Sequence, residues 1–262
     1  MDKKGLTGFQ LKMIGLILMV FDHLYSFLDN MPIQFKWIGR IVAPIFIFMT
    51  VEGYYHTSNK KKYMLRLFIG SFVMNLGNLI VPKYFPSANN IALTANIFST
   101  LFMITIYLCI VDFIIRAIKE KNILKITLGI ALFILPVALG ILIIMNIETL
   151  LSVQILGHLV LFIPNPLFIE GGPLFLLIGI VMYLLRKNRK KQLLIYAIIS
   201  LAIMFTGQLS IQGILYDNFQ WMMVFAAPLL YLYNGQKGRG MKYLFYIFYP
   251  VHIYILYIIS TL

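Results

Sequence analysis

The chain has 262 residues, of which 61% are hydrophobic and 12% charged, and this composition excludes an ordinary soluble globular protein. Its 22 basic and 9 acidic residues give a formal charge of +13. The basic residues stand in short loops between apolar runs, where they orient a membrane protein, so we expect a lipid bilayer and no nucleic acid as partner. The single cysteine, Cys109, excludes an intramolecular disulfide and a cysteine-cluster metal site.

The apolar runs predict an all-α fold, a polytopic helical membrane protein with nine to ten transmembrane helices. The segment 149–165 is apolar but short, and we predict that it is re-entrant or interfacial. No stretch of about fifty residues is left for a soluble domain, so residues 1–262 are expected to form a single integral membrane domain. The nine expected spans lie near 9–28, 35–54, 63–81, 94–116, 123–146, 168–186, 192–209, 218–233 and 242–261.

The distribution of basic residues predicts the orientation in the cell membrane. A cytoplasmic N-terminus places most of the 22 basic residues on the inner side. If 149–165 crossed the bilayer, the basic cluster at 186–191 would lie outside, against the positive-inside rule. We therefore expect nine spans and a C-terminus outside the cell.

Ionisable side chains inside the first two expected spans are the clearest functional signal. Asp22 and His23 stand in the first span, and Arg40 and Glu52 stand in the second. A charge near the bilayer centre costs several kcal/mol, so such groups usually face a protein interior or a wet cavity and carry function. Lys12 precedes His23 by eleven residues, which places both within about 20° of one helix face and about 16 Å apart along the axis.

Arg40 cannot lose its charge, so its burial requires an anionic partner or a wet cavity. Asp22 is the expected partner, although it lies about 100° round the helix from His23 and need not pair with that imidazole. Pro44 frees a carbonyl one turn earlier and predicts a kink. Glu52 stands near the inner surface, where we expect the lysines of 60–62 to neutralise it. Plain structural interpretations remain: a buried Arg–Asp pair, and a core histidine bonded to a neighbouring helix.

Amide side chains form a second group of candidates. Asn75 and Asn78 share a face of the third span, and Asn96 stands at the start of the fourth. Amides often join membrane helices, so these residues are candidates either for substrate binding or for helix packing.

The last expected span contains His252 two residues after Pro250. Pro250 has no N–H and leaves the Tyr246 carbonyl without its helical donor. His252 is a second catalytic candidate, with packing as its alternative role, and Tyr249 offers a polar group for binding a substrate. The sequence contains no HExxH motif and no acidic pair with ligand spacing, so no metal site is predicted.

Several stretches, in this order, resemble the TraX family, which is named for a protein that acetylates the N-terminus of conjugative pilin. They are LKMIGLILMVFDH, GRIVAPIFIFMTVEGYYHT, KKYMLRL, NIFSTL, EGGPLFLLIGIVMY, AAPLLYLYNGQKGRG and FYIFYPVHIYIL. That family is similar to broader transmembrane acyltransferases, which carry an essential histidine in an early span, commonly preceded by a basic residue after ten intervening positions. Lys12 and His23 reproduce this spacing. Leu24 and Tyr25 depart from the small residues that usually follow Asp-His.

The resemblance implies a membrane-embedded acyltransferase that moves acetyl from acetyl-CoA, or another acyl-CoA, to an amine or hydroxyl of an envelope or exported acceptor. It implies His23 as general base or acyl carrier, with Asp22 orienting it or balancing Arg40. Arg40 or the asparagines would stabilise the oxyanion. The donor phosphates would be bound by basic residues at the inner surface, namely Lys12, Lys60, Lys61 and Arg66.

Two other classes of function stay open from the sequence. A proton-coupled transporter or flippase of an anionic or lipid-linked solute would use Arg40 as substrate clamp and His23 as proton relay. A membrane assembly or scaffold protein would carry the same charges merely as pairs. The identity of the acceptor and the oligomeric state are not determined by the sequence.

Overall fold

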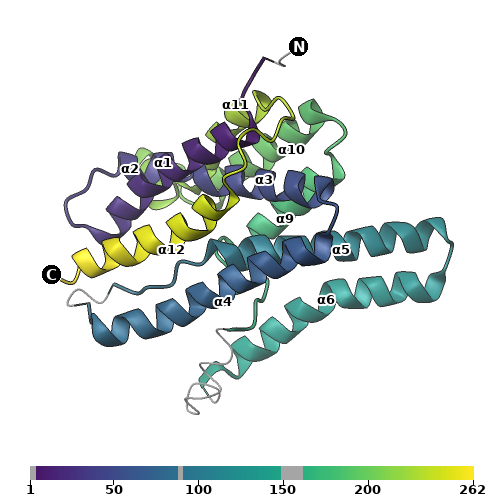
Figure 1. Cartoon of the computed structure of the whole chain (residues 1–262), viewed down its shortest axis with the longest axis horizontal. Helices are drawn as coiled ribbons and strands as arrows, with labels where there is room; N and C mark the ends of the chain where they lie inside the picture. The colour runs from purple at the N-terminus through teal and green to yellow at the C-terminus, as the bar shows by residue number, and fades with distance from the viewer. Residues whose placement is uncertain (1–3, 88–90, 149–161) are drawn as a thin grey trace. The chain divides into compact units, whose positions relative to one another are not determined.

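The computed structural model describes residues 4–87, 91–148 and 162–262, and these residues fold into helices joined by short connections (Figure 1). Within these ranges there is no β-strand, and an isolated bridge joins Leu6 to Tyr233. The prediction of an all-α fold is therefore confirmed. Most of the segment 149–165, predicted to be re-entrant or interfacial, lies outside the described residues.

The helices cover most of each expected span, but the spans expected near 192–209 and 218–233 are divided into shorter α and 3-10 segments. Their bounds are α1 Gly8–Phe27, α2 Gln34–Gly39, α3 Val42–His56, α4 Lys60–Tyr84, α5 Ile97–Lys119, α6 Ile123–Met145, α9 Gly172–Leu184, α10 Arg189–Ala202, η1 Ile203–Thr206, η2 Gly213–Asp217, η3 Gln220–Phe225, α11 Ala226–Tyr231 and α12 Lys242–Ile259. Among the described residues, five helical segments are long and apolar enough to cross a membrane, namely α1, α2 with α3, α4, α5 and α6. The protein is therefore a polytopic helical membrane protein, and the count of nine crossings stays a prediction.

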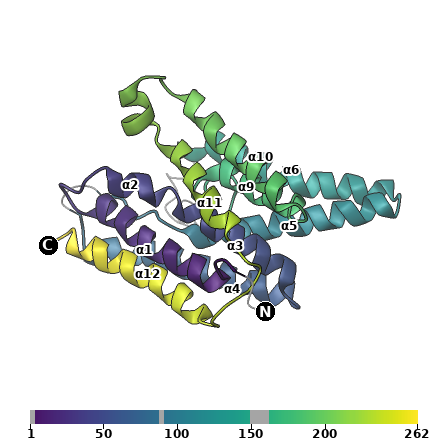
Figure 2. The same ribbon diagram turned by 90° about the horizontal axis from the view of Figure 1, so that it is seen from above.

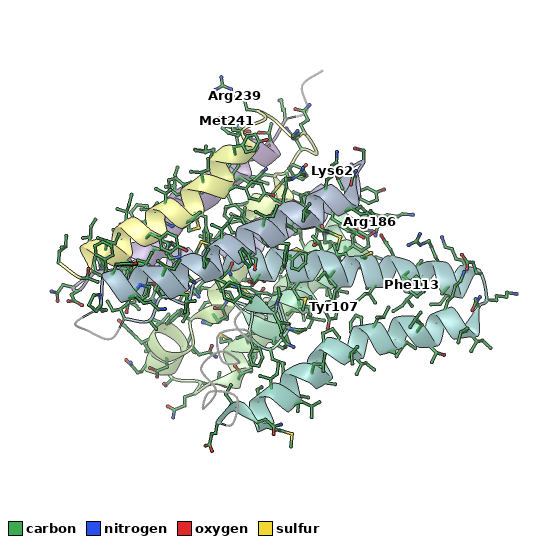
Figure 3. All side chains as sticks on the ribbon, turned by 60° about the horizontal axis from the view of Figure 1, so that its bottom comes forward. Lys62, Tyr107, Phe113, Arg186, Arg239 and Met241 are labelled. Atoms are coloured by element: carbon green, nitrogen blue, oxygen red, sulfur yellow. The ribbon has the colours of Figure 1, made fainter. Side chains whose placement is uncertain are left out.

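The contacts divide the chain into two compact units. The first contains Met1–Glu52, Leu79–Thr94 and Val181–Leu262, and the second contains Gly53–Asn78 and Ala95–Ile180. In the second unit α5 and α6 form an antiparallel hairpin (Figure 1), joined by a hydrogen bond of 3.0 Å from the Tyr107 hydroxyl to the Phe133 carbonyl. Tyr107 points from α5 toward α6 (Figure 3). Such bonds matter inside a membrane, where water does not satisfy a buried polar group.

In the first unit α1 packs against both α2 and α12. The contacts of α1 with α12 advance together along the two helices, from Lys12 on Phe245 to Phe27 on Tyr257, so these helices run in the same direction (Figure 2). Their starting ends are tied together, because the Gly8 N–H donates to the carbonyl of Gln236. The connection that contains Arg239 and Met241 leads into α12 (Figure 3).

The second expected span is broken between α2 and α3, at Arg40 and Ile41. Pro44 has no N–H to donate to the Arg40 carbonyl, four residues earlier. The backbone N–H groups of Arg40 and Ile41 bind the carbonyls of Trp37 and Ile38, three residues back, at 3.2 Å each. The kink predicted from Pro44 is therefore confirmed, and it places Arg40 at the break in the helix.

The parallel packing of α1 and α12 generates a prediction about membrane topology. If both helices cross the bilayer, the two ends of the chain lie on opposite sides. Alkaline phosphatase needs disulfides that form outside the cytoplasm. We expect a phosphatase fusion after Leu262 to be active and a fusion after Lys187 to be inactive. Activity of the second fusion, or inactivity of an intact first one, would contradict this topology.

Candidate functional site

His23 on α1 and His252 on α12 contact each other, although 229 positions separate them in sequence. The Nδ1 atom of His23 lies 2.6 Å from the Nε2 atom of His252, and the two rings stack with their centroids 4.8 Å apart. Both side chains are buried. The structure therefore joins the two histidines that the sequence marked as separate catalytic candidates.

The hydrogen bonds determine which ring nitrogens carry a proton when both histidines are neutral. His252 Nδ1 lies 2.7 Å from the carbonyl oxygen of Phe248, and a carbonyl oxygen only accepts. His252 Nδ1 therefore carries the hydrogen, and its Nε2 accepts the N–H of His23 Nδ1. This assignment leaves the lone pair of His23 on Nε2, the nitrogen that is able to act as a base.

Aromatic rings surround the histidine pair. The ring centroid of Tyr249 lies 6.2 Å from that of His23 and 5.8 Å from that of His252, and Phe248 stacks on His252 at 4.8 Å. Tyr249 thus lies beside both histidines, and its role in substrate binding stays a prediction. The carbonyl that His252 binds is that of Phe248, rather than the Tyr246 carbonyl beside which the sequence placed it.

An ion cluster lies on the neighbouring face of α1, where α2 packs. Arg40 Nη2 donates to Asp22 Oδ1 at 2.7 Å, and Lys36 Nζ lies 3.4 Å from the same oxygen. Arg40 Nη1 donates to the Oε1 atom of Gln220 at 3.1 Å. The predicted pairing of Asp22 with Arg40 is confirmed, whereas the contact with Lys36 was not predicted. The signal was present, because Lys36 stands four residues before Arg40 and hence on the same helix face.

Asp22 and His23 are consecutive but serve different helix contacts. The carboxylate of Asp22 binds cations on α2, and the imidazole of His23 binds α12. Gly39 permits the contact with α2, because a Cβ atom at this position would lie 2.4 Å from Asp22 Oδ1. Asp22 therefore balances the charges of Arg40 and Lys36.

Lys12 lies on the face of α1 that packs on α12, with its Nζ atom 4.8 Å from the Phe245 ring centroid. The predicted stripe of Lys12 and His23 along one helix face is therefore confirmed. The GQKGRG turn, at 235–240, binds the start of α1, because its Gln236 and Lys237 carbonyls accept the first N–H groups of that helix.

The asparagine candidates belong to the second unit, where they join α4 to α5. The Asn96 amide donates to Asn75 Oδ1 at 2.5 Å and to the Ser71 carbonyl at 3.0 Å, which uses both of its hydrogens. Asn78 donates to the Ala95 carbonyl at 3.1 Å. These are the contacts of residues that hold membrane helices together.

The basic candidates of α4 also belong to the second unit. Lys60 Nζ lies 2.6 Å from Asp112 Oδ2, and Lys61 is exposed. The guanidinium carbon of Arg66 lies 5.8 Å from the Tyr63 ring centroid. Lys61 is thus exposed and Arg66 is half-buried beside Tyr63, while Lys60 is held by a carboxylate.

Glu52 has a different basic partner from the lysines expected at 60–62. Arg189, at the start of α10, donates to Glu52 Oε1 at 3.3 Å, and its guanidinium lies 4.3 Å from the Phe48 ring centroid and 5.5 Å from that of Tyr233. The cluster joins α3 to α10 and supports a structural role for Glu52.

The fold and this site define a class: a polytopic helical membrane protein that carries a buried histidine pair and an ion cluster on adjacent faces of its first helix. The family model described as TraX protein matches residues 7–139 and 125–260, so the chain belongs to the TraX family. A relative from Dichelobacter nodosus, named "Probable fimbrial assembly protein FimC, serogroup H1", is 26% identical over 261 residues, which cover 95% of this chain and 94% of the relative. No solved structure matches the chain.

The close approach of α1 to α2 generates a prediction for Gly39→Ala. The new methyl group must displace the Asp22 carboxylate or move α2, and such overpacking costs about 1–3 kcal/mol. We expect a lower midpoint of thermal unfolding in detergent. Gly240→Ala is the matched control, because a Cβ atom there has nothing within 4 Å. Equal midpoints for the two variants would refute the requirement for glycine at position 39.

Proposed function

We propose that the protein is a membrane-embedded acyltransferase that moves an acetyl group from acetyl-CoA to an amine or hydroxyl of an exported or envelope acceptor. The observation that carries this proposal is the His23–His252 hydrogen bond. It leaves His23 Nε2 with a lone pair inside an apolar bundle, while Nδ1 of the same ring is hydrogen-bonded to a second imidazole. Membership of the TraX family supports the reaction class.

In the proposed reaction His23 Nε2 removes a proton from the acceptor amine or hydroxyl as that group attacks the thioester carbonyl carbon. A bond forms between the acceptor nitrogen or oxygen and the acetyl carbon, and the C–S bond of the donor breaks. The proton held by His23 then passes to the departing thiolate of CoA. The positive charge that develops on His23 is shared with His252 through the Nδ1–Nε2 hydrogen bond.

Arg40 is the proposed stabiliser of the oxyanion in the tetrahedral intermediate. It has a fixed positive charge, and its hydrogen bonds to Asp22 and Gln220 hold it in one position. These bonds leave other N–H groups of the guanidinium able to donate to an oxyanion. Lys12 is the proposed first contact for the phosphates of the donor, since it lies on the same face of α1 as His23.

The acceptor is proposed to belong to the assembly of a surface filament. The relative from Dichelobacter nodosus is named a probable fimbrial assembly protein, and the match covers nearly all of both chains. A filament subunit is an exported protein with a free amine terminus, which agrees with the class of acceptor proposed above.

Histidine variants test the proposed chemistry. We expect His23→Ala to lower the transfer of label from radiolabelled acetyl-CoA to envelope material by about 10² to 10⁴-fold, the usual contribution of a general base. His252→Ala removes a hydrogen bond to a developing charge and should lower the rate by about 10 to 100-fold. His252→Gln offers an oxygen acceptor to His23 Nδ1 and should restore part of that loss.

The control for these variants is His56→Ala, which changes an exposed histidine at the end of α3 and should keep full activity. All variants would first be compared for thermal unfolding in detergent, which separates a lost base from a misfolded chain. Undiminished transfer by His23→Ala would overturn the mechanism.

Binding of the donor is tested by calorimetric titration of acetyl-CoA and of CoA into the purified protein. We expect saturable binding that is about tenfold weaker in Lys12→Ala, since a charged hydrogen bond to a phosphate is lost. Lys187→Ala removes an exposed lysine and serves as the control. The absence of binding by folded wild-type protein would favour the transporter hypothesis over acyl transfer.

A further inference from the structure

Lys36 has no role in the proposed acyl transfer, whereas its neighbour Arg40 is the proposed stabiliser of the oxyanion and has further donors for a second anion. The ammonium of Lys36 lies 2.8 Å from the hydroxyl oxygen of Ser26 and 3.4 Å from Asp22 Oδ1. Arg40 binds the same carboxylate oxygen at 2.7 Å. Two cations therefore share one carboxylate, and the cluster carries a net charge of about +1.

Other acidic residues nearby in the chain do not balance this charge. Asp29 follows α1 and Asp217 precedes η3, and both are exposed. Within the described part of the chain neither of them forms an ion pair with Lys36 or Arg40. The excess charge is costly, because the side chains of Lys36, Arg40 and Asp22 are only 22%, 19% and 15% exposed.

Some N–H donors of Lys36 and Arg40 have no acceptor among the described residues. Arg40 has five N–H donors, and the described residues accept three of them, at the Lys36 carbonyl, Gln220 and Asp22. Lys36 has three N–H donors, and two of them are directed to Ser26 and Asp22. A guanidinium and an ammonium held side by side with remaining donors match the oxygens of an anion.

Neighbouring contacts hold the cluster in place before any ligand arrives. The indole N–H of Trp37 donates to the Leu215 carbonyl at 2.7 Å, which ties α2 to η2. The guanidinium of Arg40 lies 5.7 Å from the Phe219 ring centroid. A site whose cations are already oriented loses less entropy when it binds a ligand.

The position of the cluster relates it to the histidine pair. Asp22 and His23 are consecutive on α1, with Cα atoms about 3.8 Å apart, and they face α2 and α12 respectively. The cations at Asp22 and the proposed base at His23 are therefore held by neighbouring positions of one helix. This is the arrangement expected for a site that orients one end of a molecule while its other end reacts.

We propose that Lys36, together with Arg40 and Asp22, forms a binding site for a singly charged oxyanion, a carboxylate or a phosphodiester, carried by the acceptor. The proposal rests on the proposed function only for the statement that this anion belongs to the acceptor. Lys36 is then a specificity residue, and it selects acceptors that bear a negative charge beside their nucleophile.

The two tryptophans of the chain provide a direct measurement, because Trp37 follows Lys36 and Trp221 follows Gln220. Full-length protein in nanodiscs of zwitterionic phosphatidylcholine would be titrated with acetate and with dimethyl phosphate while tryptophan fluorescence is recorded. Acetamide and trimethyl phosphate are the uncharged counterparts. No acetyl-CoA is present, so the result does not depend on transfer activity.

We expect a saturable change in fluorescence with at least one anion and none with the uncharged counterparts. Lys36→Gln should weaken the binding about tenfold or more, the consequence of losing a charged hydrogen bond. Lys36→Arg keeps the charge and should keep the binding, which also shows that position 36 tolerates substitution. Lys187→Gln is the control for an exposed lysine at another place in the first unit.

The remaining arms distinguish the source of the anion. A response to acetate alone indicates a carboxylate, and a response to dimethyl phosphate alone indicates a phosphodiester. Loss of that second response in nanodiscs that contain phosphatidylglycerol identifies a lipid headgroup as the occupant. Equal binding by wild type and Lys36→Gln, or no saturable response in folded wild-type protein, overturns the site. Anion binding without acetyl transfer would uphold the site and refute only the proposed function.

Discussion

The hydrogen bond between His23 and His252 constrains much of the first unit. Each imidazole is buried in an apolar bundle, where a polar group without a partner destabilises the fold. Mutual pairing satisfies one nitrogen of each ring, and the Phe248 carbonyl satisfies a second nitrogen of His252. This requirement brings the last helix against the first, in parallel, and it leaves His23 Nε2 available for chemistry.

The charged groups of the membrane helices follow the same rule. Asp22 binds Arg40 and Lys36, Glu52 binds Arg189, and Asp112 binds Lys60. The pair of Glu52 and Arg189 joins α3 to α10, which are far apart in the chain, whereas the other pairs join consecutive helices, α1 with α2 and α4 with α5. The Asp22 cluster differs because it contains two cations for one carboxylate, and this excess makes it a candidate for binding an anion.

α1 therefore has two functional faces that meet at consecutive residues. One face, through His23, holds the proposed base against α12, and the adjacent face, through Asp22, holds the cations of α2. Gly39 allows the second contact because a side chain there would occupy the space of the carboxylate. The break in the helix before Pro44 places Arg40 where an irregular backbone is tolerated in a protein interior. The proposed reaction centre and the proposed anion site thus both depend on one helix that packs against two others.

The sequence by itself determined the class of protein and most of the helical segments, because hydropathy, proline and charge act locally along a helix. It also predicted the Asp22–Arg40 pair, since a buried charge requires a partner of opposite sign and these two residues stand on consecutive spans. The asparagines were predicted as candidates for substrate binding or helix packing, but only the structure showed that Asn96 donates both amide hydrogens to acceptors on α4. The contact of His23 with His252, the partnership of Glu52 with Arg189 and the second cation at Asp22 were decided by tertiary structure. The first two of these contacts join distant parts of the chain, and no periodicity within one helix encodes which distant helix will cover a given face.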